Sequence, residues 1–128
     1  MLQVTALYAG VLGLYFLWLA RLVIAARGRH GISLGTDHVE VLRAVRAHGN
    51  FAEYTPLALL LLAMAEFRGA PGLLLHGLCL LLLVGRVSHA WGVSHLDEDL
   101  RFRVAGMVAT FAALIAAALT LLVQALVR

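Results

Sequence analysis

Four polar residues in the first half of the chain share one face of a predicted helix. Arg43, Arg46, Asn50 and Glu53 follow one another at steps of three, four and three residues, and this spacing aligns side chains along a helix. Arginine offers planar, bidentate recognition of carboxylates, whereas asparagine and glutamate can hold an amide or an ammonium group. The pattern therefore predicts a binding site for a small zwitterionic ligand with several carboxylates, beside an apolar wall that could admit a lipophilic partner.

Two other segments are expected to bring charged groups to the same level. Arg86 and His89 lie near the end of a long apolar segment, and Arg103 lies at the start of the last one. At 1.5 Å per residue, Glu53 lies about 20 Å from the outer end of its helix, and Arg86 lies about 22 Å from the outer end of its own. Because these depths match, we predict a buried ion pair between Glu53 and Arg86. The alternative is a purely structural clamp, in which a neighbouring arginine neutralises Glu53 and no ligand binds.

The composition places these residues in a membrane protein. Hydrophobic residues make up 62% of the chain and charged residues only 13%. Soluble domains carry roughly 25% charged residues, so this chain could not cover a surface that faces water, and the lipid bilayer is its natural solvent. The chain has no basic stripe with interleaved aromatic residues, so no nucleic-acid partner is expected.

The pattern of apolar runs predicts an all-α fold, an integral membrane four-helix bundle. The helices are expected at about residues 2–26, 37–67, 71–91 and 100–127, in a single domain of residues 1–128. Asp37, followed by Glu40, has the form of a capping box at the start of the second helix, and Pro71 suits the first position of the third. To cross the bilayer, the second helix must carry Asn50 and Glu53 into the membrane, where ionisable residues usually face a bundle interior or a wet cavity.

The arginines predict the orientation. They flank the first and third connections, and Arg68 and Arg128 alone belong to the opposite side. Positive charge favours the cytoplasm, so both arginine-rich loops are expected there and both termini on the non-cytoplasmic side. The histidines show no pair with the compact spacing of a known metal site, so no metal is predicted.

Three segments resemble signatures of one family. Residues 46–54, RAHGNFAEY, followed by Pro56 and an apolar run, resemble the second-helix signature of the MAPEG family, the membrane-associated proteins in eicosanoid and glutathione metabolism. Residues 85–89, GRVSH, look like its third-helix motif, and residues 101–107, RFRVAGM, look like the start of its fourth helix. The matches fall in the right order and cover nearly the whole chain, with the closest likeness to small bacterial members.

The resemblance implies a homotrimer in a bacterial inner membrane, with glutathione as co-substrate between neighbouring subunits on the cytoplasmic side. Arg103 would be the catalytic residue that stabilises the glutathione thiolate, because a nearby cation lowers a thiol pKa and the thiolate is the nucleophile. The residues that the resemblance implies for glutathione binding are Arg46, Asn50, Glu53, Arg86 and His89.

The leading prediction is a glutathione-dependent enzyme of the transferase or peroxidase type, acting on lipophilic electrophiles or hydroperoxides. The alternative is a non-catalytic binding or accessory protein with the same fold and an incomplete glutathione site. Gly49 and Val93 favour it, because some better-studied members carry arginine and tyrosine there. Some members also carry a serine where this chain has Val104. A small transporter is a third reading, which the single off-centre polar cluster disfavours.

Overall fold

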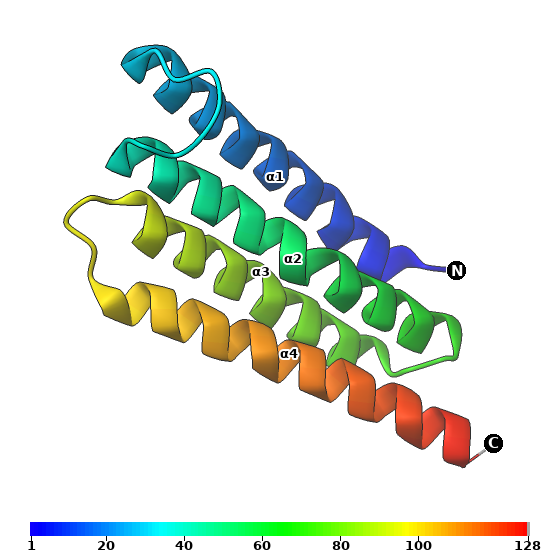
Figure 1. Cartoon of the computed structure of the whole chain (residues 1–128). Helices are drawn as coiled ribbons and strands as arrows, with labels where there is room; N and C mark the ends of the chain where they lie inside the picture. Colours follow the sequence, from blue (N-terminus) through cyan, green and yellow to red (C-terminus); the bar gives the residue numbers. More distant parts are fainter. Residues whose placement is uncertain (128) are drawn as a thin grey trace.

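Residues 1–127, which the computed structural model describes, form four helices that lie side by side along the molecule (Figure 1). They are α1 (Gln3–His30), α2 (Val39–Phe67), α3 (Gly72–Ser94) and α4 (Leu100–Leu126). The all-α four-helix architecture is thus confirmed. Arg128, predicted on the non-cytoplasmic side, lies outside the described residues.

Three helices, α1, α3 and α4, are long and apolar enough to cross a bilayer. The second helix does not reach the same hydropathy because its first half carries the charged residues of the predicted site. It nevertheless has 29 residues and contacts each of the other three helices along their length (Figure 1). At 1.5 Å per residue it is about 43 Å long, which exceeds the roughly 30 Å hydrocarbon core of a bilayer.

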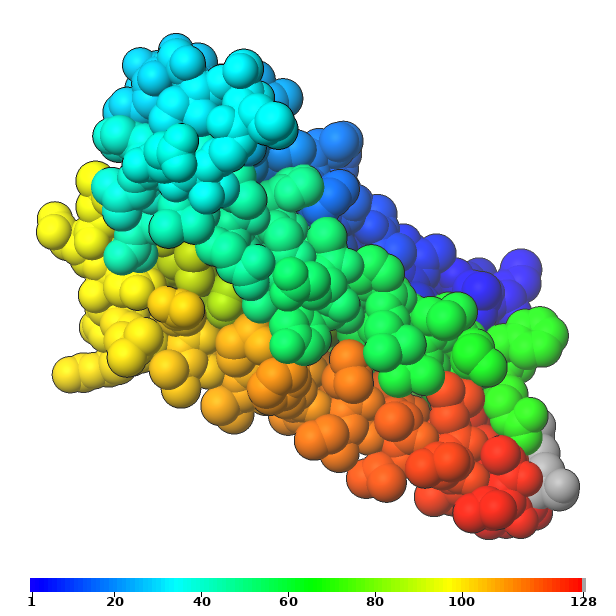
Figure 2. Space-filling view, viewed as in Figure 1, coloured from blue at the N-terminus to red at the C-terminus, as the bar shows by residue number. Residues whose placement is uncertain are grey.

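The two arginine-rich connections lie at one end of the bundle and both termini at the other (Figure 1). Figure 2 shows the α1–α2 connection and the α3–α4 connection on the same end of the elongated molecule. The polar residues that the sequence singled out near these connections are therefore gathered at one membrane face.

The apolar side chains divide between a narrow core and a lipid-facing exterior. Leu12, Leu62, Leu82 and Ala113 are fully buried, and each comes from a different helix. Many large hydrophobic side chains are exposed along all four helices, among them Leu14, Leu60, Leu73 and Ile115. An apolar exterior of this kind is stable in hydrocarbon and not in water.

Glycine allows α3 and α4 to approach backbone to backbone. A Cβ atom placed on Gly106 would lie 2.4 Å from the backbone nitrogen of His89 and 2.6 Å from the carbonyl oxygen of Gly85. Small residues at a crossing permit close packing of membrane helices. This contact fixes how α3 is rotated against α4, and it brings Arg86 and His89 next to the start of α4.

The helix ends differ from the predicted ones by a few residues. The first helix continues to His30 and ends at Gly31, whose φ of 63° suits glycine, and α3 continues past Trp91 to Ser94. Pro71 is the N-cap of α3 instead of its first helical residue.

The predicted capping box at Asp37 is wrong, because His38 caps α2 and its Nδ1 accepts a hydrogen bond from the backbone nitrogen of Glu40 at 3.2 Å. The Glu40 carboxylate contacts Arg29 and His30 on α1, so it does not complete a capping box.

Candidate functional site

Arg86 is the buried centre of the polar cluster. It lies on α3 and is only 1% exposed. Its Nη1 donates to Asn50 Oδ1 on α2 at 2.7 Å, its Nε donates to Thr110 Oγ1 on α4 at 2.9 Å, and its Nη2 lies 3.2 Å from Met107 Sδ. A buried charge needs hydrogen-bond partners to offset its lost hydration, and these come from two neighbouring helices.

The predicted ion pair between Glu53 and Arg86 is wrong. No carboxylate of residues 1–127 lies within 4.0 Å of the Arg86 guanidinium, and Glu53 Oε1 instead lies 3.5 Å from Arg46 Nη1. The side chains of Arg46 and Glu53 are about half exposed, at 55% and 52%. Two residues three apart on a helix point about 60° away from each other, and it is Asn50 that faces Arg86. The depth argument compared only positions along the helix axes and could not place Glu53 around the axis of α2.

His89 lies one turn beyond Arg86 on α3 and is 4% exposed. Its Nδ1 is buried and has no hydrogen-bond partner among the described residues. Buried polar atoms in folded proteins are nearly always hydrogen-bonded, so an unpaired one beside a pocket marks a place where a ligand can bind. The backbone of His89 is held against Gly106 of α4, which fixes the position of the ring.

A pocket of about 270 Å³ lies among these helices at the end of the bundle that carries the arginine-rich connections. Its lining residues are Val39, Leu42, Arg43, Arg46, Asn50, His89, Val93 and Arg103. Of the six residues predicted for the site, Arg46, Asn50, His89 and Arg103 therefore line one cavity. Arg86 lies behind Asn50 and supports it, while Glu53 pairs with Arg46 outside the lining.

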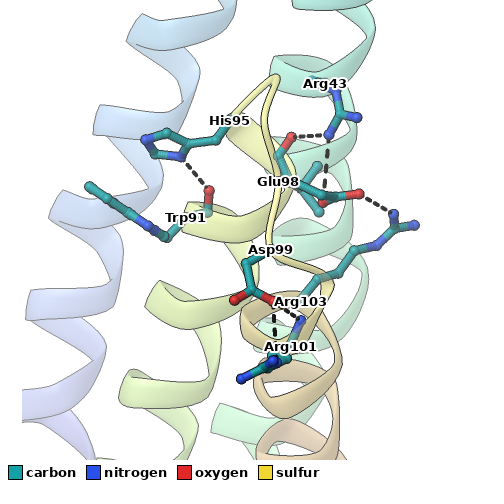
Figure 3. A network of polar contacts seen from close by, with 8 residues as sticks. Arg43, Trp91, His95, Glu98, Asp99, Arg101 and Arg103 are labelled. Atoms are coloured by element: carbon teal, nitrogen blue, oxygen red, sulfur yellow. Dashed lines mark hydrogen bonds and ion pairs between the residues drawn. The ribbon is translucent and has the colours of Figure 1, made fainter.

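One residue of this cluster, Glu98, received no role from the sequence. Glu98, in the connection before α4, lies between Arg43 and Arg103 (Figure 3). Its Oε1 is 3.3 Å from Arg103 Nη1, and its Oε2 is 3.5 Å from Arg43 Nη1. The same Arg43 nitrogen donates to the carbonyl oxygen of Val93 at 3.1 Å. A loop residue has no periodicity that could have placed Glu98 here from the sequence.

The rest of the connection is held by its own local contacts. Asp99 is the N-cap of α4, and its Oδ1 accepts from the backbone nitrogen of Arg101 at 3.0 Å. His95 Nδ1 lies 2.7 Å from the carbonyl oxygen of Trp91 at the end of α3 (Figure 3). Gly92 approaches Arg103 closely, since a Cβ atom there would lie 2.8 Å from the Arg103 backbone nitrogen. These contacts position Arg103 at the pocket independently of Glu98.

A second polar cluster joins the end of α1 to the start of α2. The possible ligand atoms of His30, His38 and Glu40 all lie within 4.8 Å of one another, although the sequence predicted no metal site. Arg29 and His30 both pair with the Glu40 carboxylate. The hydrogen bond with His30 has the larger effect and that with Arg29 the next, and both hold the pKa of Glu40 below its usual value. Because an arginine already neutralises this carboxylate and His38 serves as a helix cap, we interpret the cluster as a clamp between the two helices.

Comparison with known proteins gives two consistent matches. The MAPEG family model matches residues 5–123. Over 114 residues the sequence is 34% identical to the inner membrane protein YecN of Escherichia coli strain K12. The aligned segment covers 88% of this chain and 86% of that protein. The YecN protein of Escherichia coli O6:H1 matches equally well. The name of this relative gives its location in the inner membrane and no reaction.

Proposed function

The chain belongs to the MAPEG family, and on that premise we propose that it is a membrane enzyme that uses glutathione as a co-substrate. Its thiol would attack a lipophilic electrophile or hydroperoxide that arrives from the bilayer. The observation that carries this proposal is the pocket in which Arg43, Arg46 and Arg103 converge with Asn50 and His89. Few ligands other than a small, multiply anionic one would suit three guanidinium groups in one cavity.

Binding would use the charges of glutathione, which has two carboxylates and one ammonium group. The arginines of the pocket are suited to the carboxylates. Asn50 is fixed by its hydrogen bond to Arg86, so its amide is oriented before a ligand arrives. Glu53, half exposed beside Arg46, is the acid available to the ammonium group.

Activation would rest on Arg103. A guanidinium beside the glutathione sulfur favours the thiolate over the thiol, and the thiolate is the attacking species. In a transfer reaction the thiolate forms a bond to an electrophilic carbon, and the leaving group departs with the bonding electron pair. With a hydroperoxide, the sulfur attacks the outer oxygen and the O–O bond breaks to release an alcohol. A second glutathione would then form the disulfide and release water.

We also propose that the protein works as a homotrimer. Arg46 and Glu53 are half exposed on a helix that crosses the membrane, and charged groups at such depth are costly unless protein or water covers them. The pocket, at about 270 Å³, is also at or below the small end of ligand sites, which run from about 300 to 1,000 Å³. A neighbouring protomer against α2 would cover the charges and complete the cavity.

The arginine-rich connections are proposed to face the cytoplasm, where glutathione is made. The positive-inside rule supports this orientation, since both connections at that end of the bundle carry arginines. Both termini would then lie on the opposite side.

The test is thiolate formation and turnover by the purified protein in detergent. Adding glutathione should produce an ultraviolet thiolate absorbance, and a chromogenic electrophile should be conjugated. Arg103→Ala should reduce kcat/KM by at least about 10²-fold, the usual scale for loss of a group that stabilises developing charge. Arg101→Ala is the matched control, because Arg101 is 92% exposed and pairs only loosely with Asp99, at 3.8 Å. Equal activity of the Arg103 variant and wild type would refute the assigned role.

A non-catalytic accessory role is the second candidate, and the lining of the pocket favours it at one point. Val93 presents an apolar side chain to the cavity, where some family members carry a tyrosine hydroxyl. Glutathione binding without a thiolate signal and without turnover would select this candidate. A lack of binding by an intact assembly would remove glutathione from both.

A further inference from the structure

The ion pairs of Glu98 leave polar atoms unsatisfied on both sides. Its contacts to Arg43 and Arg103, at 3.5 and 3.3 Å, are longer than the roughly 2.7–2.9 Å of a strong charge-assisted hydrogen bond. Arg43 Nε and Glu98 Oε2 are both buried and have no hydrogen-bond partner among the described residues. Arg43 therefore retains an unused donor next to the Glu98 carboxylate.

Both arginines line the pocket, whereas Glu98 does not. Glu98 approaches them from the connection between α3 and α4, with its side chain 15% exposed. Its carboxylate thus partly neutralises two cations that line the same cavity. Like charges at short range repel, so a carboxylate from some source is needed to hold them together.

From this geometry we infer that Arg43 and Arg103 form an anion subsite, and that Glu98 is the chain's own carboxylate that occupies it when no ligand is bound. The anionic group of a ligand, which for glutathione would be the thiolate, would displace Glu98 and could use the unsatisfied Nε donor of Arg43. Glu98 would then set how tightly anions bind and would keep weaker ones out. The identity of the ligand as glutathione rests on the proposed function, whereas the subsite itself does not.

The alternative is that Glu98 only fastens the connection to α2. The contacts of that connection disfavour it as the main role, because Asp99 caps α4, His95 contacts the end of α3 and Gly92 packs on Arg103 without any help from Glu98. Removing the Glu98 charge should therefore leave the fold intact and change anion binding. A fastening role makes the opposite prediction, with a lower melting temperature and no gain in affinity.

The experiment is calorimetric titration of glutathione into the full-length protein in detergent micelles. Glu98→Gln should bind glutathione about tenfold more tightly than wild type, the scale expected when two partly exposed ion pairs no longer compete with the ligand. Asp97→Asn is the matched control, because Asp97 lies next to Glu98, is exposed and forms no ion pair within residues 1–127. It should bind as wild type does. If wild type binds glutathione and a folded Glu98→Gln protein binds it equally or more weakly, the inference is overturned.

Two further measurements separate this inference from the proposed function. Inorganic sulfate should bind Glu98→Gln more tightly than wild type, even if glutathione binds neither; that result would retain the subsite and discard glutathione. If sulfate and glutathione both fail to distinguish the variant from wild type, the subsite is refuted. If Glu98→Gln melts at a markedly lower temperature than wild type, Glu98→Asp is the variant to test, because it keeps the charge on a shorter side chain. It should still bind sulfate more tightly, since the shortened carboxylate reaches the two arginines less well.

Discussion

Removal of Asn50 is expected to destabilise the protein far more than removal of Glu53, three residues further along α2. Asn50→Ala deletes the oxygen that accepts from Arg86 Nη1 at 2.7 Å and leaves a buried guanidinium short of one acceptor. Hydrogen bonds to charged groups contribute about 1.5–3 kcal/mol, and an unsatisfied buried donor carries a similar penalty. We therefore expect the free energy of unfolding to fall by about 2–3 kcal/mol.

Glu53→Ala is the internal comparison. Its carboxylate is half exposed and lies 3.5 Å from Arg46, which is also half exposed. Exposed ion pairs contribute about 0–1 kcal/mol, so the expected loss is below about 1 kcal/mol. The two variants remove polar groups of similar size from neighbouring turns of the same helix, and they differ in which one supports the buried arginine.

The measurement is equilibrium unfolding in mixed micelles, with a rising fraction of denaturing detergent and helix content followed by circular dichroism. The midpoint and slope of each transition give the difference between the two variants. If Glu53→Ala lost as much stability as Asn50→Ala, Glu53 would be the functional counter-ion of Arg86. The arrangement described here for α2 against α3 would then be wrong.

Two other changes test the packing and the clamp. Gly106→Ala should lower the free energy of unfolding by about 1–3 kcal/mol, because its methyl group would lie 2.4 Å from the His89 backbone nitrogen. Thermal melting checks this prediction. Gly10→Ala is the control, because a methyl group at Gly10 would meet nothing within 4 Å. The lowered pKa of Glu40 means that its contacts with His30 and Arg29 stabilise the α1–α2 corner above the usual glutamate pKa, and this stabilisation is lost as the pH falls through the lowered value. The hydrogen-exchange protection factors of the α1–α2 connection, which are corrected for the intrinsic pH dependence of exchange, should therefore fall in acid in wild type. Glu40→Gln should abolish that dependence, and an identical acid response in both proteins would exclude the clamp.

The sequence by itself determined the class of the protein and the level of its polar residues. Long apolar runs specify helices in a bilayer whatever their neighbours are, since backbone groups in hydrocarbon must bond within their own segment. The rise per residue along a helix is constant, so Arg46, Asn50 and His89 could be assigned to one membrane face before any fold was known. Helix ends were less predictable, and α2 begins after a histidine cap because Glu40 turns to α1 instead of to Asp37.

Only the tertiary structure decided which of these residues meet. The rotation of one helix against another depends on side-chain packing. The packing of α2 against α3 placed Asn50, and not Glu53, beside Arg86. The position of Glu98 between Arg43 and Arg103 depends on three separate segments, so no local pattern could encode it. Distance along a helix follows from covalent geometry, whereas direction around it and contacts across the bundle follow from the packing of the whole chain.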